Sequence, residues 1–189
     1  MPKLFSYVVA HDLGFAPNPF GTFCTLAKCK FGTRKRRNIV ELAEVGDWIA
    51  GTGAADLGKS AGHGKLIYAM RVDEVIPLHE YCKAYCGHRI DAEPEDDDPT
   101  SVALVSRYFF YFGRNAIDIS DIPQKYLDHP FEKFGPGHRA DFKEEFVEAF
   151  AEWLRLHFKI GIHGPPCKPH PELKLPTCPA QVRRKGRSR

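Results

Sequence analysis

A cysteine, a histidine and an aspartate of this sequence could supply a nucleophile and the groups that support it. Cys24 could attack a substrate, with His138 or His11 as the base that takes the proton of the thiol. Asp12 completes the candidate catalytic set. Such a site requires that the rigid loops at residues 11–21 and 135–139 be neighbours in the fold.

The six cysteines do not form a recognisable metal knuckle, because structural zinc sites usually pair two short Cys-x-x-Cys or histidine knuckles. Their spacings are Cys24-x4-Cys29, Cys82-x3-Cys86-x-His88 and Cys167-x2-His170 with Cys178. Phosphate-loop, Rossmann, Gly-x-Ser-x-Gly and His-Glu-x-x-His motifs are also missing from the sequence. We therefore expect free thiols, no metal and no cofactor.

A stiff loop at residues 11–21 is the first candidate for ligand binding. It contains two prolines and two glycines, and proline fixes its own φ and restricts the residue before it. Such a loop can hold Asp12, Phe15 and Asn18 at fixed positions in a binding site. In the alternative interpretation the loop is a rigid connector whose polar residues cap turns and whose aromatic residues fill the core.

Three more residues are candidates for ligand contacts. Trp48 lies inside a predicted strand, where a tryptophan either fills the core or offers a stacking surface. Thr52 lies at the end of the same strand, between two glycines. Tyr111 lies in the most aromatic stretch of the chain, and a buried phenol must find a hydrogen-bond partner.

The formal net charge of +3 is small but unevenly distributed. Residues 28–37 and 183–189 are basic, whereas residues 93–98 are acidic. Basic clusters favour phosphates through counterion release, although a solvated loop and a disordered tail have the same composition. The candidate phosphate contacts are Lys30, Arg34, Arg36 and Arg139.

The element expected to organise these residues is a β-hairpin. Residues 45–53 form its first strand, between a Gly-Asp turn and a Gly-Thr-Gly turn, and residues 65–72 alternate as the second. The small, polar residues 54–64 between them predict a solvent-facing loop beside a site. We expect the hairpin at the centre of the fold.

The other elements complete an α+β domain. Aromatic residues at helical spacing predict an amphipathic helix over residues 141–159. Further strands are expected at residues 4–10, 22–30, 102–112 and 116–119, and a short helix after Pro77. Residues 38–44 could form a helical turn or an extended connector. Together these elements predict a curved mixed sheet or a small PUA-like β-barrel, with the C-terminal amphipathic helix packed against it.

Length and composition predict one domain at residues 1–165, followed by a basic, proline-rich and disordered tail at residues 166–189. Apolar residues make up 43% of the chain, as in ordinary globular proteins. No apolar run approaches the ~20 residues that cross a bilayer. We therefore expect a cytoplasmic protein with no membrane contact.

Six stretches of the chain, between residues 4 and about 165, also recur in order in a known family. They are Tyr7-Val-Val-Ala-His-Asp-Leu-Gly-Phe-Ala-Pro-Asn-Pro-Phe20, Cys24-Thr-Leu-Ala-Lys-Cys-Lys30, Val45-Gly-Asp-Trp-Ile-Ala-Gly-Thr-Gly53, Lys65-Leu-Ile-Tyr-Ala-Met-Arg-Val72, Tyr108-Phe-Phe-Tyr-Phe-Gly113 and Gly137-His-Arg139. In the first three, glycine, proline, asparagine and cysteine recur in order. On these residues the chain resembles the second of the nucleotide modification associated domain families.

The resemblance implies a domain found near base-modification and phage-conflict systems that binds or processes modified nucleotides. More weakly, the Gly-Asp-Trp strand and its hairpin resemble the PUA and EVE barrels, which hold a base in an aromatic-lined cleft. In the family, the segment between the helix near Tyr81 and the strand at Val102 is often longer, with a Gly-Asp-Asn-x-Tyr piece. An acidic loop replaces it here, and the arginine-rich tail is an addition.

We therefore expect the protein to bind a nucleotide or a modified nucleobase within nucleic acid, with the oligomeric state left open. Polar edges of the base would be contacted by Asp12 and Asn18, and its face by Trp48, Phe15 or Tyr111. One alternative is a nucleotide- or base-processing enzyme that uses the candidate catalytic set. Another is a protein–protein adaptor that docks through the helix at residues 141–159.

Overall fold

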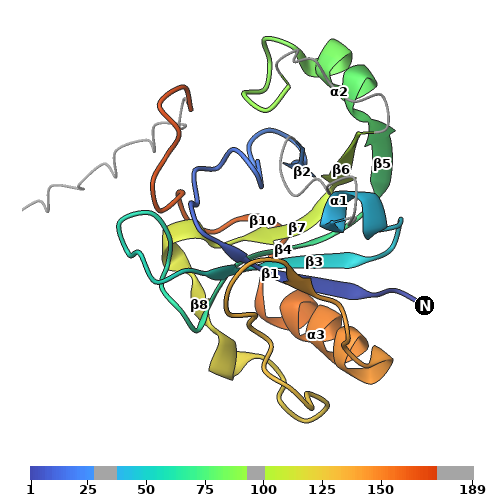
Figure 1. The fold of residues 1–189 in the computed structure, drawn as a ribbon, viewed down its shortest axis with the longest axis vertical. Coiled ribbons are helices and arrows are strands. Elements are labelled where there is room, and N and C mark those ends of the chain that lie inside the picture. The colour runs from blue at the N-terminus through green and yellow to red at the C-terminus, as the bar shows by residue number, and fades with distance from the viewer. Residues whose placement is uncertain (28–37, 93–100, 174–189) are drawn as a thin grey trace, which may run out of the picture.

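The structure is a computed structural model, and it describes residues 1–27, 38–92 and 101–173 (Figure 1). The strands are β1 (Leu4–Val9), β2 (Cys24–Leu26), β3 (Trp48–Gly53), β4 (Lys65–Arg71), β5 (Glu74–Pro77), β6 (Val102–Ser106), β7 (Tyr108–Tyr111), β8 (Ile117–Asp118), β9 (His138–Arg139) and β10 (Gly161–Ile162). The α-helices are α1 (Ile39–Leu42), α2 (Leu78–Tyr85) and α3 (Glu144–His157), and the short 3-10 helices are η1 (Gly113–Asn115) and η2 (Ile119–Asp121).

The predicted hairpin lies in the middle of a seven-stranded sheet. Strand order is β10-β7-β4-β3-β1-β9, with β8 beside β4. The β3 and β4 strands pair antiparallel, whereas β1 pairs with β3, and β7 with β10, in parallel. The α+β class and the mixed sheet are thus confirmed, and the sheet is open rather than closed into a barrel.

One face of this sheet packs against α3, which lies within the range predicted for the C-terminal helix (Figure 1). The helix buries Phe146, Phe150 and Leu154 against Trp48 and Phe110 of the sheet. Full burial of each such side chain contributes about 1.5–3 kcal/mol, so this layer is a major source of stability. None of the described helices is long and apolar enough to cross a membrane.

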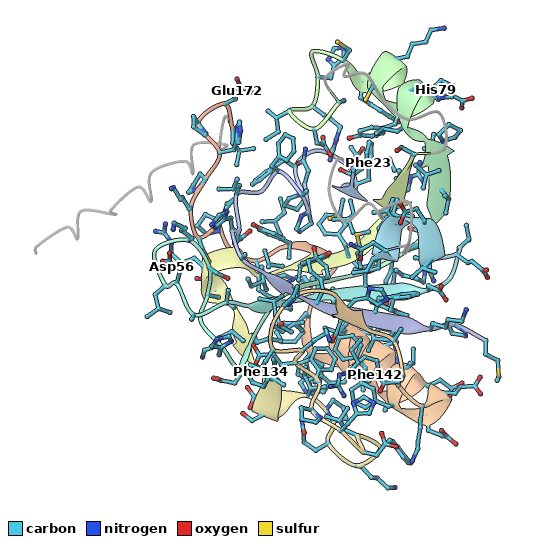
Figure 2. All side chains as sticks on the ribbon, in the orientation of Figure 1. Phe23, Asp56, His79, Phe134, Phe142 and Glu172 are labelled. Atoms are coloured by element: carbon cyan, nitrogen blue, oxygen red, sulfur yellow. The ribbon has the colours of Figure 1, made fainter. Side chains whose placement is uncertain are left out.

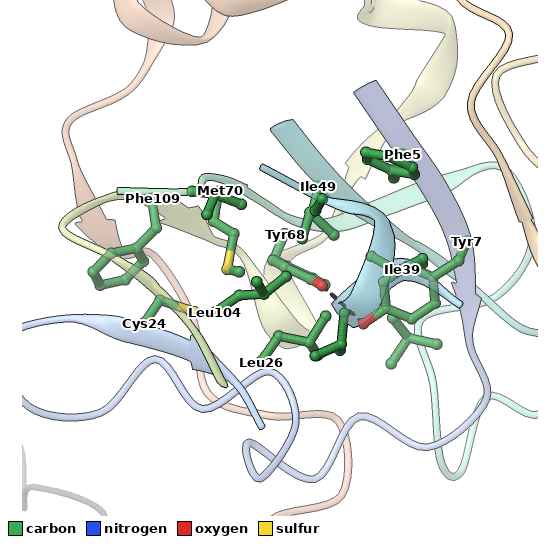
Figure 3. Close-up of a cluster of buried hydrophobic side chains, with 14 of the residues drawn as sticks. Phe5, Tyr7, Cys24, Leu26, Ile39, Ile49, Tyr68, Met70, Leu104 and Phe109 are labelled. Atoms are coloured by element: carbon green, nitrogen blue, oxygen red, sulfur yellow. Dashed lines mark hydrogen bonds between the residues drawn. The ribbon is translucent and has the colours of Figure 1, made fainter. Parts of the chain in front are cut away.

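The opposite face of the large sheet carries α1 and a second sheet of order β2-β6-β5 (Figure 1). Between them is a second apolar cluster, in which the hydroxyl groups of Tyr7 and Tyr68 lie 2.8 Å apart (Figure 3). The segment left undecided at residues 38–44 forms α1. Asn38 caps this helix, and its backbone N–H donates to Glu41 in return, as in a capping box.

The β structure predicted at residues 102–112 is present, but it is divided into two strands because the chain changes sheets at Arg107. The part before it, β6, belongs to the small sheet, and the part after it, β7, belongs to the large one. At the break the backbone N–H of Arg107 donates to a carboxylate oxygen of Asp73 instead of to a neighbouring strand. Asp73 lies between β4 and β5, where the chain passes from the large sheet to the small one. Its bond to Arg107 therefore joins the two places at which the chain changes sheets.

The tip of the hairpin is partly packed. Residues 55–58 are exposed, as predicted, but Ser60 is buried. Its hydroxyl donates to the carbonyl oxygen of Val9 at 2.7 Å and accepts from the backbone N–H of Ala54 at 2.9 Å. The tip therefore folds over the ends of β1 and β3, next to the loop that follows β1.

Candidate functional site

A cleft of about 560 Å³ opens beside the second sheet, and its size is within the usual range for small-molecule sites. It is formed by the loop after β1, the start of β2, the turn after α2, and a C-terminal segment. The lining residues are Asn18, Phe20, Gly21, Thr22, Phe23, Tyr85, Gly87, His88, Arg89, Ile90, Glu172 and Leu173.

Arg89 holds the loop that forms one wall of the cleft. An arginine side chain has five N–H donors, and all five are engaged here. The acceptors are the carbonyl oxygens of Asn18, Phe20 and Phe23 and the hydroxyl oxygens of Thr25 and Tyr81. Since no donor is left over, Arg89 fixes the shape of the wall and has none to offer a ligand.

Asp91 lies behind Arg89 and balances its charge. Its carboxylate is 0% exposed, lies 3.4 Å from Nε of Arg89, and accepts hydrogen bonds from Asn18 at 2.7 Å, from Tyr81 at 2.9 Å and from Thr25. A buried ion pair is stable only when further hydrogen bonds satisfy both partners, as they do here. Burial also raises the pKa of Tyr81, which keeps this hydroxyl neutral and able to donate.

Aromatic rings form the apolar part of the cleft. Phe23 meets Tyr85 edge to face with ring centroids 5.2 Å apart, and the guanidinium of Arg89 lies 4.4 Å above the ring of Phe23. Phe23 is buried by these contacts, whereas Phe20 and Tyr85 are only half-buried. The latter two therefore keep ring surface that a ligand can cover.

The opposite wall is a strap, defined as residues 165–173, that crosses the loop after β1. The buried carboxylate of Asp12 accepts from the hydroxyl of Tyr111 at 2.5 Å and from the backbone N–H of Cys167 at 2.8 Å. Lys168 and His170 donate backbone N–H groups to the carbonyl oxygens of residues 12 and 13. These bonds hold the strap in place, with Glu172 at its far end (Figure 2).

Gly14 allows the loop and the strap to approach closely. A Cβ at this position would lie 2.7 Å from the side chains of both Phe20 and Pro166, and the φ of +68° is itself unfavourable for other residues. The loop and the strap also meet through their side chains, because the ring of Phe15 stacks on that of His170 with centroids 5.4 Å apart. Burial at this crossing, followed by the charge of Asp12, raises the pKa of the Cys167 thiol to about 12.

The predicted ligand-binding residues of the 11–21 loop use their side chains to support the walls of the cleft. Asp12 anchors the strap, Phe15 packs on it, and Asn18 uses its side chain on Asp91 and on the backbone N–H of Phe20. Of these three, only Asn18 lines the cleft. The strap residues also show that the described structure continues past residue 165, where the sequence placed the start of the tail.

Thr52 and Tyr111 support the fold around the cleft. The hydroxyl of Thr52 is buried and donates to the carbonyl oxygen of Tyr7 at 3.2 Å. Tyr111 donates to Asp12, and burial, followed by the neighbouring carboxylate, raises its pKa. Its ring lies edge-on to Phe20 at 6.5 Å, so it stands behind a residue of the cleft wall.

Trp48 and Arg139 lie away from the cleft. Trp48 is 5% exposed and packs on the α3 face of the large sheet, between Tyr108 and Phe150. Arg139 is on the edge strand β9, where its buried Nε has no hydrogen-bond partner among the residues that the structure describes. The predicted phosphate contacts Lys30, Arg34 and Arg36 lie outside the described residues.

The three candidate catalytic residues have different sets of neighbours. Cys24 is fully buried in the core, and this burial raises the pKa of its thiol well above the usual range, which disfavours the thiolate. His138 lies on β9, with Nδ1 3.3 Å from Oδ1 of Asn38 and its ring edge-on to Phe5. Asp12 holds the strap, as described above.

Sequence reasoning missed the residues that shape the cleft, above all Arg89, Asp91, Tyr85 and Glu172. The pair Arg89-Ile-Asp91 follows a helix in an otherwise irregular segment, and such charges are usually solvated. Only the fold shows that these two side chains are buried. Tyr85 ends the short helix predicted after Pro77, and its partial exposure depends on contacts outside that helix.

The family model described as nucleotide modification associated domain 2 matches residues 1–95 and 85–173, and these two segments together contain every residue that lines the cleft. No curated protein matches the chain, nor does any solved structure.

Proposed function

The chain belongs to the nucleotide modification associated domain 2 family, and from this premise we propose that its cleft binds a nucleotide or a modified nucleobase within nucleic acid. The setting would be the DNA-modification or phage-conflict systems that the family resemblance implies. The observation that carries the proposal is the cleft of about 560 Å³, with two half-buried aromatic rings on walls that buried hydrogen bonds hold in place.

The rings of Phe20 and Tyr85 suit the flat face of a base. Stacking on an aromatic side chain contributes about 1–3 kcal/mol per base and tolerates different bases, because every base has a π-face. Both rings lie on segments that Arg89 and its partners hold in place. A site of this kind is formed before the ligand arrives, so little binding energy is lost to ordering it.

Phosphates would lie outside the cleft in this arrangement. Arg89 is the only arginine or lysine among the described lining residues, and its donors are all in use. Phosphate contacts would then fall to the basic residues assigned from the sequence, at residues 28–37, at Arg139 and in the tail.

The test is a Tyr85→Ala variant, measured by fluorescence anisotropy with short single-stranded DNA and RNA that carry either unmodified cytosine or 5-hydroxymethylcytosine. We expect binding to weaken about tenfold, as the removal of one stacking ring predicts. The matched control is Tyr126→Ala, because Tyr126 is 39% exposed and outside the cleft, beside Lys125. Thermal melting of both variants checks that each is folded.

Equal weakening in the two variants, or no binding of any oligonucleotide at low salt, would contradict the proposal. Turnover of a nucleotide that is abolished by Cys24→Ala would establish the processing enzyme instead. Since Cys24 is buried in the core and not in the cleft, the same substitution leaves binding unchanged if the protein is a reader.

A further inference from the structure

One carboxylate lies among the polar groups that the cleft presents to a ligand. The ionisable lining residues are Tyr85, His88, Arg89 and Glu172. Arg89 has no spare donor, and Tyr85 contributes its ring to the wall. Glu172 is exposed, and no hydrogen bond or ion pair with another described residue engages its carboxylate.

The position of Glu172 is set by the strap and by the turn at its end. The backbone N–H of Glu172 lies 3.3 Å from Nδ1 of His170, and that of Leu173 donates to the carbonyl oxygen of His170 at 2.9 Å. The ring of His170 is itself stacked on Phe15. Because of these contacts, the backbone that carries the carboxylate is fixed at the cleft wall although the side chain can turn.

We propose that Glu172 selects nucleobases that present an amino group, such as adenine, cytosine and their amine-bearing modified forms, over bases that present a carbonyl oxygen in its place. This inference rests on the proposed function and adds to it the chemical class of the ligand. An ionised carboxylate only accepts hydrogen bonds, so it attracts an exocyclic amino group and repels the lone pairs of a carbonyl. Glutamate accepts from the amino group of cytosine in the same way in known base readout.

The same carboxylate disfavours phosphate inside the cleft. No lysine lines it among the described residues, and its one arginine is fully hydrogen-bonded to the protein. A nucleoside therefore binds at least as tightly as its 5′-monophosphate. A site that recognised phosphate would show the opposite order.

The experiment is competition by free nucleosides against a labelled oligonucleotide bound to the full chain. Cytidine is compared with uridine, and adenosine with inosine, because each pair differs mainly by an amino group in place of a carbonyl. We expect the wild-type protein to prefer cytidine and adenosine about tenfold, as one good base contact predicts. In Glu172→Gln this preference falls close to one, because an amide can both donate and accept.

The matched control is Glu148→Gln, on the exposed side of α3 and outside the cleft, which keeps the wild-type preference. Nucleosides that compete with equal strength, or a preference that survives in Glu172→Gln, would overturn this inference and leave the binding function intact. If neither oligonucleotides nor nucleosides bind, the proposed function and this inference both fail.

Discussion

At Arg89 a guanidinium with the right chemistry to bind a phosphate is used to shape a loop. Its planar set of donors reaches three backbone carbonyl groups of residues 18–23, a segment with little regular secondary structure. Buried carbonyl groups without partners are costly, so a loop of this kind needs donors from elsewhere. Arg89 supplies these donors, and Asp91 makes its buried charge tolerable.

Arg89→Lys therefore destabilises the protein even though the charge is kept. A lysine has three donors on a flexible chain and cannot reproduce the planar arrangement, so several carbonyl groups and part of Asp91 are left without partners. We expect the free energy of unfolding to fall by about 3 kcal/mol, the scale for breaking a buried pair. Urea denaturation measures the change.

The control for this variant is Arg155→Lys, at an arginine that pairs with Glu152 on the solvent side of α3. Exposed pairs contribute little, so the stability of this variant stays that of the wild type. Equal midpoints for the two variants would show that the donors of Arg89 are dispensable.

The residue types of the site were easier to predict than their roles. The sequence pointed to Asp12, Asn18 and Tyr111 as polar groups near a site, and the structure places all three at the cleft or directly behind it. Their partners could not be foreseen, because the amide of Asn18 meets the carboxylate of Asp91 73 positions away along the chain. A polar side chain in a stiff loop has the same sequence pattern whether it faces a ligand or a buried carboxylate.

At the scale of elements, the cleft depends on the crossing of the strap over the loop after β1. Asp12 is the shared anchor, because its two carboxylate oxygens accept from Tyr111 and from Cys167. Asn at this position has one carbonyl oxygen and no negative charge, so Tyr111 and Cys167 can no longer both donate to it, and the bond from Cys167 loses the assistance of the charge. The contacts of Lys168 and His170 with the loop backbone then hold the strap less firmly.

We expect Asp12→Asn to increase hydrogen exchange in residues 165–173 by about tenfold, as the loss of a charge-assisted hydrogen bond of about 1.5 kcal/mol predicts. Exchange in β3 and β4 stays slow, since the anchor is not part of their pairing. Mass spectrometry of the exchanged peptides measures both. Asp56→Asn in the exposed hairpin tip is the control, and equal exchange of the strap in the two variants would argue against the anchor.

The elements that the sequence predicted well are those with a local pattern. The hairpin of β3 and β4 and the helix α3 follow from alternation and helical spacing within their own residues. The break between β6 and β7 has no such signal, because an apolar run is also typical of two successive buried strands. It is set by the distant carboxylate of Asp73, which takes the backbone N–H of Arg107.

At the scale of the whole molecule, the α+β class was predictable because strands and helices differ in period, whereas the open sheet and its parallel pairs depend on contacts between distant segments.

The charges of the whole molecule are unevenly divided between its C-terminal end and the rest of the chain. Residues 174–189 contain no acidic residue and six basic ones: Lys174, Arg183, Arg184, Lys185, Arg187 and Arg189. Because the full chain has a formal net charge of +3, removal of these six leaves residues 1–173 with −3.

This division predicts that general affinity for nucleic acid and selection of the base can be separated. Deletion of residues 174–189 makes binding less dependent on salt. On a single strand, the slope of log K against log salt becomes shallower by about 0.7 for each phosphate that the tail neutralises, or by about 4 if all six cations are engaged. Base preference stays the same, because Glu172 and the aromatic walls lie within residues 1–173. A full-length variant with glutamine at the six positions separates charge from length and should match the deletion. A salt slope that neither variant changes would assign the phosphate contacts to residues 1–173, and the absence of base preference in both would mean that the tail takes part in recognition.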